Sequence, residues 1–141
     1  MKFNKILVPV SGDRGDEEAI DLACRIAKRT KAKIYVVYVI RVKRALPLDA
    51  EIEPEVGKAE EVLSHAEDLA DEQEYEVETD LLQAREVGPA LVDEVIERGI
   101  DLVVMGMVYK KRFGEFSLGN VVPYVLKNAP CRVLLCREPV L

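Results

Sequence analysis

The chain is short of the side chains that usually carry catalysis. Its 141 residues include no tryptophan, few aromatic residues (6%) and one histidine, His65. Hydrophobic residues make up 49% of the sequence, so the core is expected to be aliphatic. His65 lies beside Ala66, off the main apolar stripe of its expected helix, so we expect it at the surface. No acid–base pair or activated nucleophile emerges from the sequence, and we expect no catalytic residues.

Cysteine is scarce as well, with only Cys24, Cys131 and Cys136. The count is odd and there is no C-x-x-C pair, and no histidine lies near them. We therefore expect three small buried hydrophobic residues in a reducing compartment, and no zinc site. Cys131 and Cys136 are five residues apart on one expected strand, so their side chains should point to opposite faces and form no disulfide.

Long apolar runs are absent. No stretch reaches transmembrane length, and the run in MKFNKILVPV is too short for a signal peptide. Acidic residues number 26 and basic residues 20, a net charge of −6, which disfavours general nucleic-acid binding. We expect a cytoplasmic protein that binds neither nucleic acid nor a membrane.

What the chain does contain is a regular alternation of buried strands and amphipathic helices. Continuous Val, Ile and Leu runs predict the strands, and apolar stripes at helical spacing predict the helices. Residues 41–54 contain two prolines and no clean period, so they are expected to form a surface loop. The expected strands are 5–10, 33–40, 76–82, 101–106 and 131–136, and the expected helices are 15–30, 56–73, 88–99 and 117–128.

This order predicts one α/β domain over residues 1–141, a doubly wound, five-stranded, mostly parallel sheet with four helices. Strands that are apolar on both faces belong to parallel sheets covered on both sides. The expected strand order is 3-2-1-4-5. Ligands bind such sheets at the carboxyl ends of the strands where the order reverses, which lies between the first and fourth strands. Residues 11–16 and 107–118 are the loops at that point.

The segment MGMVYKKRFGEFSLGN, residues 105–120, has features of a phosphate loop. It joins a strand ending in Gly106 to a helix start at Gly119, with Lys110, Lys111 and Arg112 between them. These cations are either a phosphate clamp or an ordinary solvated loop. Asp13 and Asp16 are either Mg²⁺ ligands or, for Asp16, a helix N-cap. Tyr35 and Tyr38 are expected to pack in or beside the core and not to stack on bases.

Taken together, these motifs resemble the universal stress protein family over the whole chain. The resemblance rests on I-L-V-P-V in the first strand, an E-x-x-x-x-L-A helix, V-x-x-V-I in the second strand and D-L-V-V-M-G in the fourth. The tail N-A-P-C-R-V-L-L-C-R is also characteristic. Nucleotide-binding members carry a G-x-x-G-x(9)-G-S/T loop and an Asp after V-P-V. The resemblance implies a nucleotide site built from Pro9, Ser11, Asp13, Val39, Met105, Gly106, Tyr109, Gly119, Asn120 and Val121.

This sequence departs from that pattern at three positions. Tyr109 replaces the second glycine, Asn120 replaces the Ser/Thr, and Ser11 replaces the Asp. Asn120 can still donate to a phosphate, but Tyr109 adds bulk where backbone N–H groups should contact it, and Ser11 carries no charge. We therefore expect weak or absent ATP binding, with ATP and Mg as the only candidate cofactors and no metal site of its own. Residues 11–13 also faintly resemble the S-G-G-x-D-S loop of ATP pyrophosphatases, a weak match.

The resemblance implies a stress-response binding protein and a homodimer joined through the C-terminal strand, near Cys131 to Arg137. That strand is apolar and would otherwise be an open sheet edge. Three functions stay open. The chain is a sensor that binds ATP or AMP, a non-nucleotide member acting through its dimer and an unidentified protein partner, or a slow ATP-hydrolysing enzyme.

Overall fold

Five strands form one parallel sheet in the order β3-β2-β1-β4-β7, as the sequence predicted. The structure is a computed structural model, and it describes residues 2–108, 111–112, 115–116 and 120–138. The strands of this sheet are β1 (Lys5–Pro9), β2 (Lys33–Arg41), β3 (Glu78–Ala84), β4 (Leu102–Met107) and β7 (Arg132–Arg137). The helices are α1 (Gly15–Lys28), α2 (Glu53–Glu72), α3 (Val87–Arg98) and α4 (Val121–Asn128).

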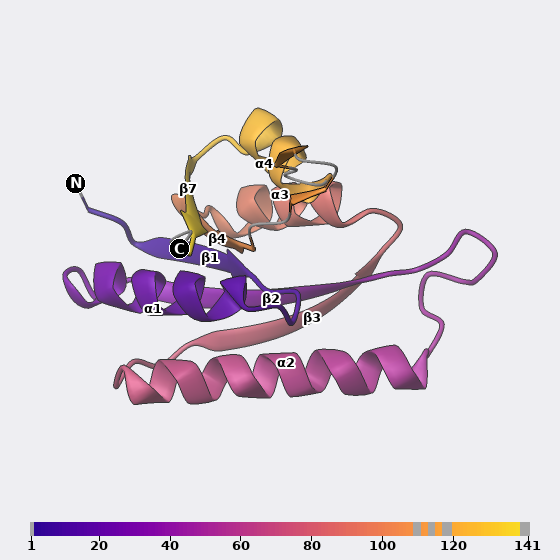
Figure 1. Ribbon diagram of the computed structural model, residues 1–141, viewed down its shortest axis with the longest axis horizontal. Helices are drawn as coiled ribbons and strands as arrows, with labels where there is room; N and C mark the ends of the chain where they lie inside the picture. Colours follow the sequence, from indigo (N-terminus) through magenta and orange to yellow (C-terminus); the bar gives the residue numbers. More distant parts are fainter. Residues whose placement is uncertain (1, 109–110, 113–114, 117–119, 139–141) are drawn as a thin grey trace.

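The helices cover both faces of the sheet, α1 and α2 on one side and α3 and α4 on the other (Figure 1). Alternate residues of β1 show why both faces need cover. Ile6 and Val8 belong to the cluster that includes α1 and α2, whereas Leu7 belongs to the cluster on the α3 and α4 side. All three side chains are fully buried. The fold is therefore the doubly wound α/β arrangement, with the aliphatic core expected from the composition.

The two tyrosines of β2 and Cys24 lie in the core region as the sequence suggested, but Cys131 and Cys136 are only half-buried, because β7 is the outer strand of the sheet. Tyr35 is 7% exposed and Tyr38 is half-buried, and both pack in hydrophobic clusters. Cys24, Cys131 and Cys136 are free thiols. Cys136 packs on the α1 and α2 side of the sheet and Cys131 on the opposite side, as their spacing predicted.

Several boundaries differ from the prediction; α2, for example, begins at Glu53 instead of residue 56, and α1 ends at Lys28 instead of residue 30. β3 begins at Glu78 instead of residue 76, because the turn that ends α2 continues to Tyr75, whose N–H donates to the Ala70 carbonyl. α4 begins at Val121, four residues later than expected, and residues 117–119 lie outside the described part of the chain. Pro123 is the third residue of α4, within the first turn, where the absence of its N–H costs no helical hydrogen bond. The segment expected to be a plain loop contains a short antiparallel pair, β5 (Lys111–Arg112) and β6 (Glu115–Phe116).

Within the described residues, no helix has both the length and the hydrophobicity needed to cross a membrane.

Candidate functional site

The candidate site lies at the carboxyl ends of β1 and β4, where the strand order reverses. These strands pair directly, with Ile6 opposite Leu102 and Leu7 opposite Val103. From β1 the sheet continues to β2 and β3 on one side and to β4 and β7 on the other. Pro9 and the loop after it therefore meet the last residues of β4. The fold brings the loop after β1 to the end of β4, where the second predicted segment begins.

Two glycines make the closest contact between these segments. A Cβ added to Gly106 would overlap the carbonyl group of Gly15, and a Cβ added to Gly15 would lie 2.8 Å from the Met107 nitrogen. The start of α1 thus crosses the end of β4 backbone against backbone. Gly106 is explained by this packing alone, because no other residue would let α1 approach β4 so closely. The sequence assigned Gly106 to phosphate binding and gave Gly15 no role in the site.

Asp13 organises the beginning of α1. Its Oδ1 accepts a hydrogen bond from the Gly15 N–H at 2.9 Å, and its Oδ2 accepts one from the Ser11 hydroxyl at 2.9 Å. Ser11 and Asp13 are both exposed. Ser11 therefore offers its oxygen lone pairs to a ligand, while its proton is directed at Asp13. The carboxylate nearest to the position of the family's Asp belongs to Asp13.

Asp16 has a role that the sequence interpretation missed. It is not the N-cap, because α1 begins at Gly15 and the cap position is Arg14. Instead its carboxylate turns back to the loop and accepts from the Ser11 N–H at 3.1 Å and the Gly12 N–H at 2.7 Å. Asp16 is 8% exposed. Only the tertiary fold reveals this bond, because α1 must first pack on β4 to bury the side chain.

Burial also changes the acidity of Asp16. Removal from water raises the pKa of its carboxyl group to about 6, although the two backbone N–H groups act in the opposite direction. The neighbouring charge of Asp13 raises this pKa further, and His65 lowers it. The backbone N–H groups of Ser11 and Gly12 are therefore occupied by an internal carboxylate that is mostly ionised at neutral pH.

The remaining predicted site residues are spread around this point. Met105 is 4% exposed and packs against Val122 and Val125, so it supports the site from inside the core. Val39 is half-buried at the end of β2. Asn120 is exposed at the cap position of α4, where its side chain makes no capping hydrogen bond, and Val121 is half-buried as the first residue of that helix. Tyr109, Lys110 and Gly119 lie outside the described residues.

Helix α2 also borders the loop, which the sequence did not suggest. His65 Nε2 lies 3.5 Å from a carboxylate oxygen of Glu17, and both side chains are exposed. A Cβ added to Gly12, which has φ +90°, would lie 3.0 Å from Val62. A shallow cavity of about 280 Å³ separates the loop from α2 and is lined in part by Asp13, Glu61 and His65. The surface position expected for His65 is confirmed.

The carboxylates of this region do not form a metal centre. Within the described residues, no three His, Cys, Asp or Glu side chains are grouped so that they could hold a metal ion. Asp13 and Asp16 each accept hydrogen bonds from backbone N–H groups of the same loop. These hydrogen bonds are enough to explain why the loop has an aspartate at both positions.

Comparisons of the sequence and of the structure with known proteins all point to the same family. A family model described as the universal stress protein family matches residues 2–137. The universal stress protein MJ0531 of Methanocaldococcus jannaschii is 30% identical, over 97% of this chain and 84% of its own length. A universal stress protein of Archaeoglobus fulgidus, solved in complex with dAMP, has a TM-score of 0.75 at 21% identity, with 96% of this chain and 98% of that chain covered. A family member from Arabidopsis thaliana with AMP bound has a TM-score of 0.71 at 18% identity, with 97% and 93% covered.

Proposed function

Because this chain belongs to the universal stress protein family, we propose that it is a homodimeric stress-response binding protein whose β1–β4 site takes adenine nucleotides weakly or not at all. The contact between Gly15 and Gly106 carries this proposal. It brings the start of α1 directly against the end of β4, so the backbone of Gly106 is already in contact with protein on that side.

Similar proteins support adenine nucleotides as the ligand class. Two neighbours of the same fold were solved with dAMP and with AMP. In this chain Ser11, after β1, and Asn120, before α4, are both exposed, and both can hydrogen-bond a sugar or a phosphate. Lys110, Lys111 and Arg112 supply positive charge to the following loop.

The hydrogen bonds of the β1–α1 loop support weak binding. Asp16 already occupies the N–H groups of Ser11 and Gly12, so these groups are not free to bind an anion. The Ser11 hydroxyl proton is directed at Asp13. Both carboxylates of the loop already accept hydrogen bonds within the loop and the first turn of α1.

The homodimer belongs to the same proposal. β7 is an outer strand of the sheet, and it ends the sheet with an unpaired edge among the described residues. Leu134 and Leu135 are adjacent on β7 and point to opposite faces, and they are 39% and 36% exposed. Antiparallel pairing of β7 with its two-fold mate would cover both leucines and satisfy the open edge.

Restoring the family pattern should test the site. Ser11→Asp alone would place a second carboxylate against Asp13, so it is combined with Asp13→Ser, which moves the charge by two positions. Adding Tyr109→Gly and Asn120→Ser completes the pattern. A charged hydrogen bond contributes about 1.5–3 kcal/mol, so we expect the fourfold variant to bind Mg-ATP more than about tenfold more tightly than wild type.

Titration calorimetry measures both affinities, and Asp13→Ser alone is the matched control that should bring no gain. Micromolar binding by wild type would show that this site is a genuine nucleotide sensor. An unchanged fourfold variant would show that loop shape, and not these side chains, limits binding. Phosphate release from ATP above a buffer blank would favour the enzyme alternative.

A further inference from the structure

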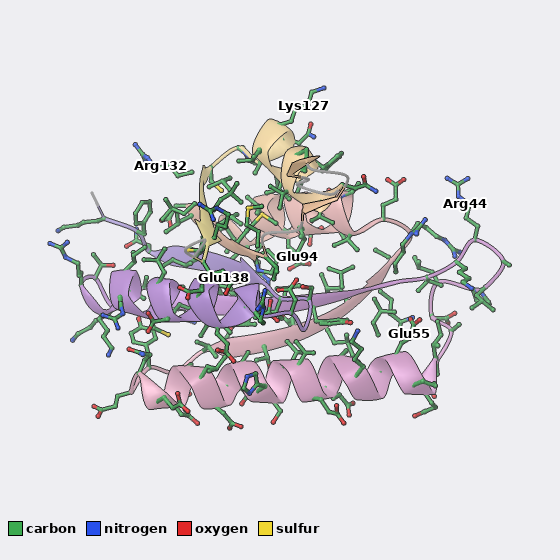
Figure 2. All side chains as sticks on the ribbon, in the orientation of Figure 1. Arg44, Glu55, Glu94, Lys127, Arg132 and Glu138 are labelled. Carbon is green, nitrogen blue, oxygen red and sulfur yellow. The ribbon has the colours of Figure 1, made fainter. Side chains whose placement is uncertain are left out.

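The loop between β2 and α2 projects beyond the end of the sheet (Figure 1). Leu46 and Leu48 are 38% and 48% exposed, and Pro47 between them is exposed too. Lys43 and Arg44 precede them, and Arg44 points away from the body of the molecule (Figure 2). Neither cation forms an ion pair with a described residue. Residues 43–48, here termed the loop tip, thus combine exposed apolar side chains with unpaired positive charge.

Two side chains at the end of β3 hold this projection in place. Arg85 Nη1 donates to the carbonyl oxygens of Lys43 at 2.6 Å and Leu46 at 2.8 Å. Gln83 Nε2 donates to the carbonyl oxygens of Leu48 at 3.0 Å and Ala50 at 2.9 Å. The backbone is therefore fixed on both sides of the leucines. A fixed loop loses little conformational entropy when it binds, which is the physical advantage of preorganisation.

A groove of about 390 Å³ lies next to the loop tip, between the end of β3 and α3. Leu82, Pro89 and Ala90 give it apolar surface, and Gln83 and Arg85 also line it. The carboxylates of Glu86, Asp93 and Glu97 are exposed along it. None of these three forms an ion pair with a described residue, whereas Glu94 beside them is paired with Arg98 at 2.7 Å. The groove therefore combines apolar surface with a row of exposed acidic side chains.

The loop tip and this β3–α3 groove are complementary in both polarity and charge. We propose that a second copy of this chain docks here, with the loop tip of each copy inserted in the β3–α3 groove of the other around a two-fold axis. Arg85 and Gln83 contact both features, so the two lie side by side on one copy, as a self-complementary interface requires. The leucines are exposed within their own chain, so they are free to enter the groove of the partner. This contact lies at the β3 side of the sheet, away from β7.

A charge exchange between copies tests the proposal. Variant A carries Lys43→Glu and Arg44→Glu, and variant B carries Asp93→Lys and Glu97→Lys. Each variant alone places like charges in both halves of the contact, so its self-association should be at least about tenfold weaker than that of wild type. In a mixture of A and B each loop again meets a groove of opposite charge, and association should return to within about threefold of wild type.

Sedimentation velocity measures the mass of the assemblies that wild type, each variant and the mixture form. Amide resonances then show which residues make the contact. In wild type, increasing concentration should shift the amide resonances of residues 43–48 and 86–97, and about 0.5 M NaCl should reduce the effect because it screens the charges. Leu46→Ser with Leu48→Ser should abolish these shifts without changing the fold. Concentration-independent spectra in both regions, or a mixture of A and B that associates no better than either alone, would overturn the proposal.

Discussion

At the residue scale, Asp16 has the most unusual environment in the described chain. Among the described residues it is the one buried charged side chain. Its two carboxylate oxygens accept hydrogen bonds from backbone N–H groups of the preceding loop. Burial raises its pKa to about 6, so the folded protein holds the proton more tightly than the unfolded chain. A raised pKa means that ionisation costs folding free energy. The contribution of Asp16 to stability is therefore greatest below about pH 4 and is lost as pH rises through about 6.

The variant Asp16→Asn makes this testable, because the amide does not titrate. The stability advantage of wild type over this variant should fall between pH 4.5 and pH 7.5 by about 2 kcal/mol, since one pKa unit corresponds to about 1.4 kcal/mol and part of the titration lies below pH 4.5. Urea unfolding of both proteins at several pH values measures the difference. A parallel series in a His65→Gln background separates the titration of the nearby histidine. Parallel pH profiles for wild type and Asp16→Asn would contradict the expectation.

At the element scale, the helix ends show where local sequence signals hold and where they do not. Three helices end in the same way. Just beyond each helix, one residue has a positive φ, and the backbone N–H of the next residue donates a hydrogen bond to the carbonyl oxygen five residues before it. Only α3 has glycine at the left-handed position, Gly99 with φ 65°, and the sequence identified this end correctly. The other two positions are Lys31 with φ 57° and Glu74 with φ 55°. The closing bonds are Ala32 to Ala27, Tyr75 to Ala70 and Ile100 to Val95.

The charged side chains in the last turn of α2 interact unfavourably with the helix dipole. α1 has acids in its first turn and Arg25 and Lys28 in its last, but α2 has no basic residue in its last turn. Glu72 there faces Asp68 one turn earlier and lies at the negative end of the helix dipole. Replacing Glu72 with Lys should reverse both interactions and stabilise the protein by about 0.5–1 kcal/mol.

Thermal unfolding at low ionic strength measures this gain. Glu72→Gln, which removes the charge without reversing it, is the matched control and should give a smaller increase. Added salt should narrow the gap between the variants, because the side chains are exposed. A lysine variant no more stable than the glutamine variant would show that neither the dipole nor the Asp68 pair matters at this end.

At the scale of the whole molecule, the two edges of the sheet differ in character. Residues 49–86, which include α2 and β3, carry fifteen acidic and two basic side chains, a net charge of −13. The rest of the chain carries a net +7, because the total is −6. The β3 edge is thus protected by charge, whereas β7 presents leucines. β7 carries its two charged residues, Arg132 and Arg137, only at its ends, and an edge strand with exposed apolar residues at its centre needs a partner to cover them.

The proposed β7 dimer predicts a clear change in mass. Wild type should sediment at twice the 15.8 kDa chain mass in about 0.5 M NaCl, where the charged loop contact is screened. Leu134→Lys with Leu135→Lys places two like charges on the edge and should yield the single chain. Ile96→Lys on α3, whose native side chain is 61% exposed, is the control and should leave the mass unchanged. A wild type that is monomeric at micromolar concentration would remove the β7 dimer from the proposal.

Much of the fold follows from local pattern, and the candidate site follows only in part. Residues 34–40 and 102–105 are apolar or aromatic without interruption, which is typical of a strand buried on both faces, so the parallel sheet could be predicted. The place of the site at the β1–β4 reversal followed from that order. Tyr109 and Gly119, which the sequence also assigned to the site, lie outside the described residues.

The sequence by itself determined the succession of strands and helices, because hydrophobic periodicity is a property of neighbouring residues. The tertiary structure alone decided what the site residues contact. Gly106 meets Gly15 only after α1 crosses β4, and Asp16 turns back to Ser11 only when that crossing buries it. Arg85 holds the Lys43 carbonyl 42 residues earlier in the chain. Such contacts depend on the register of packed elements, which no local pattern encodes.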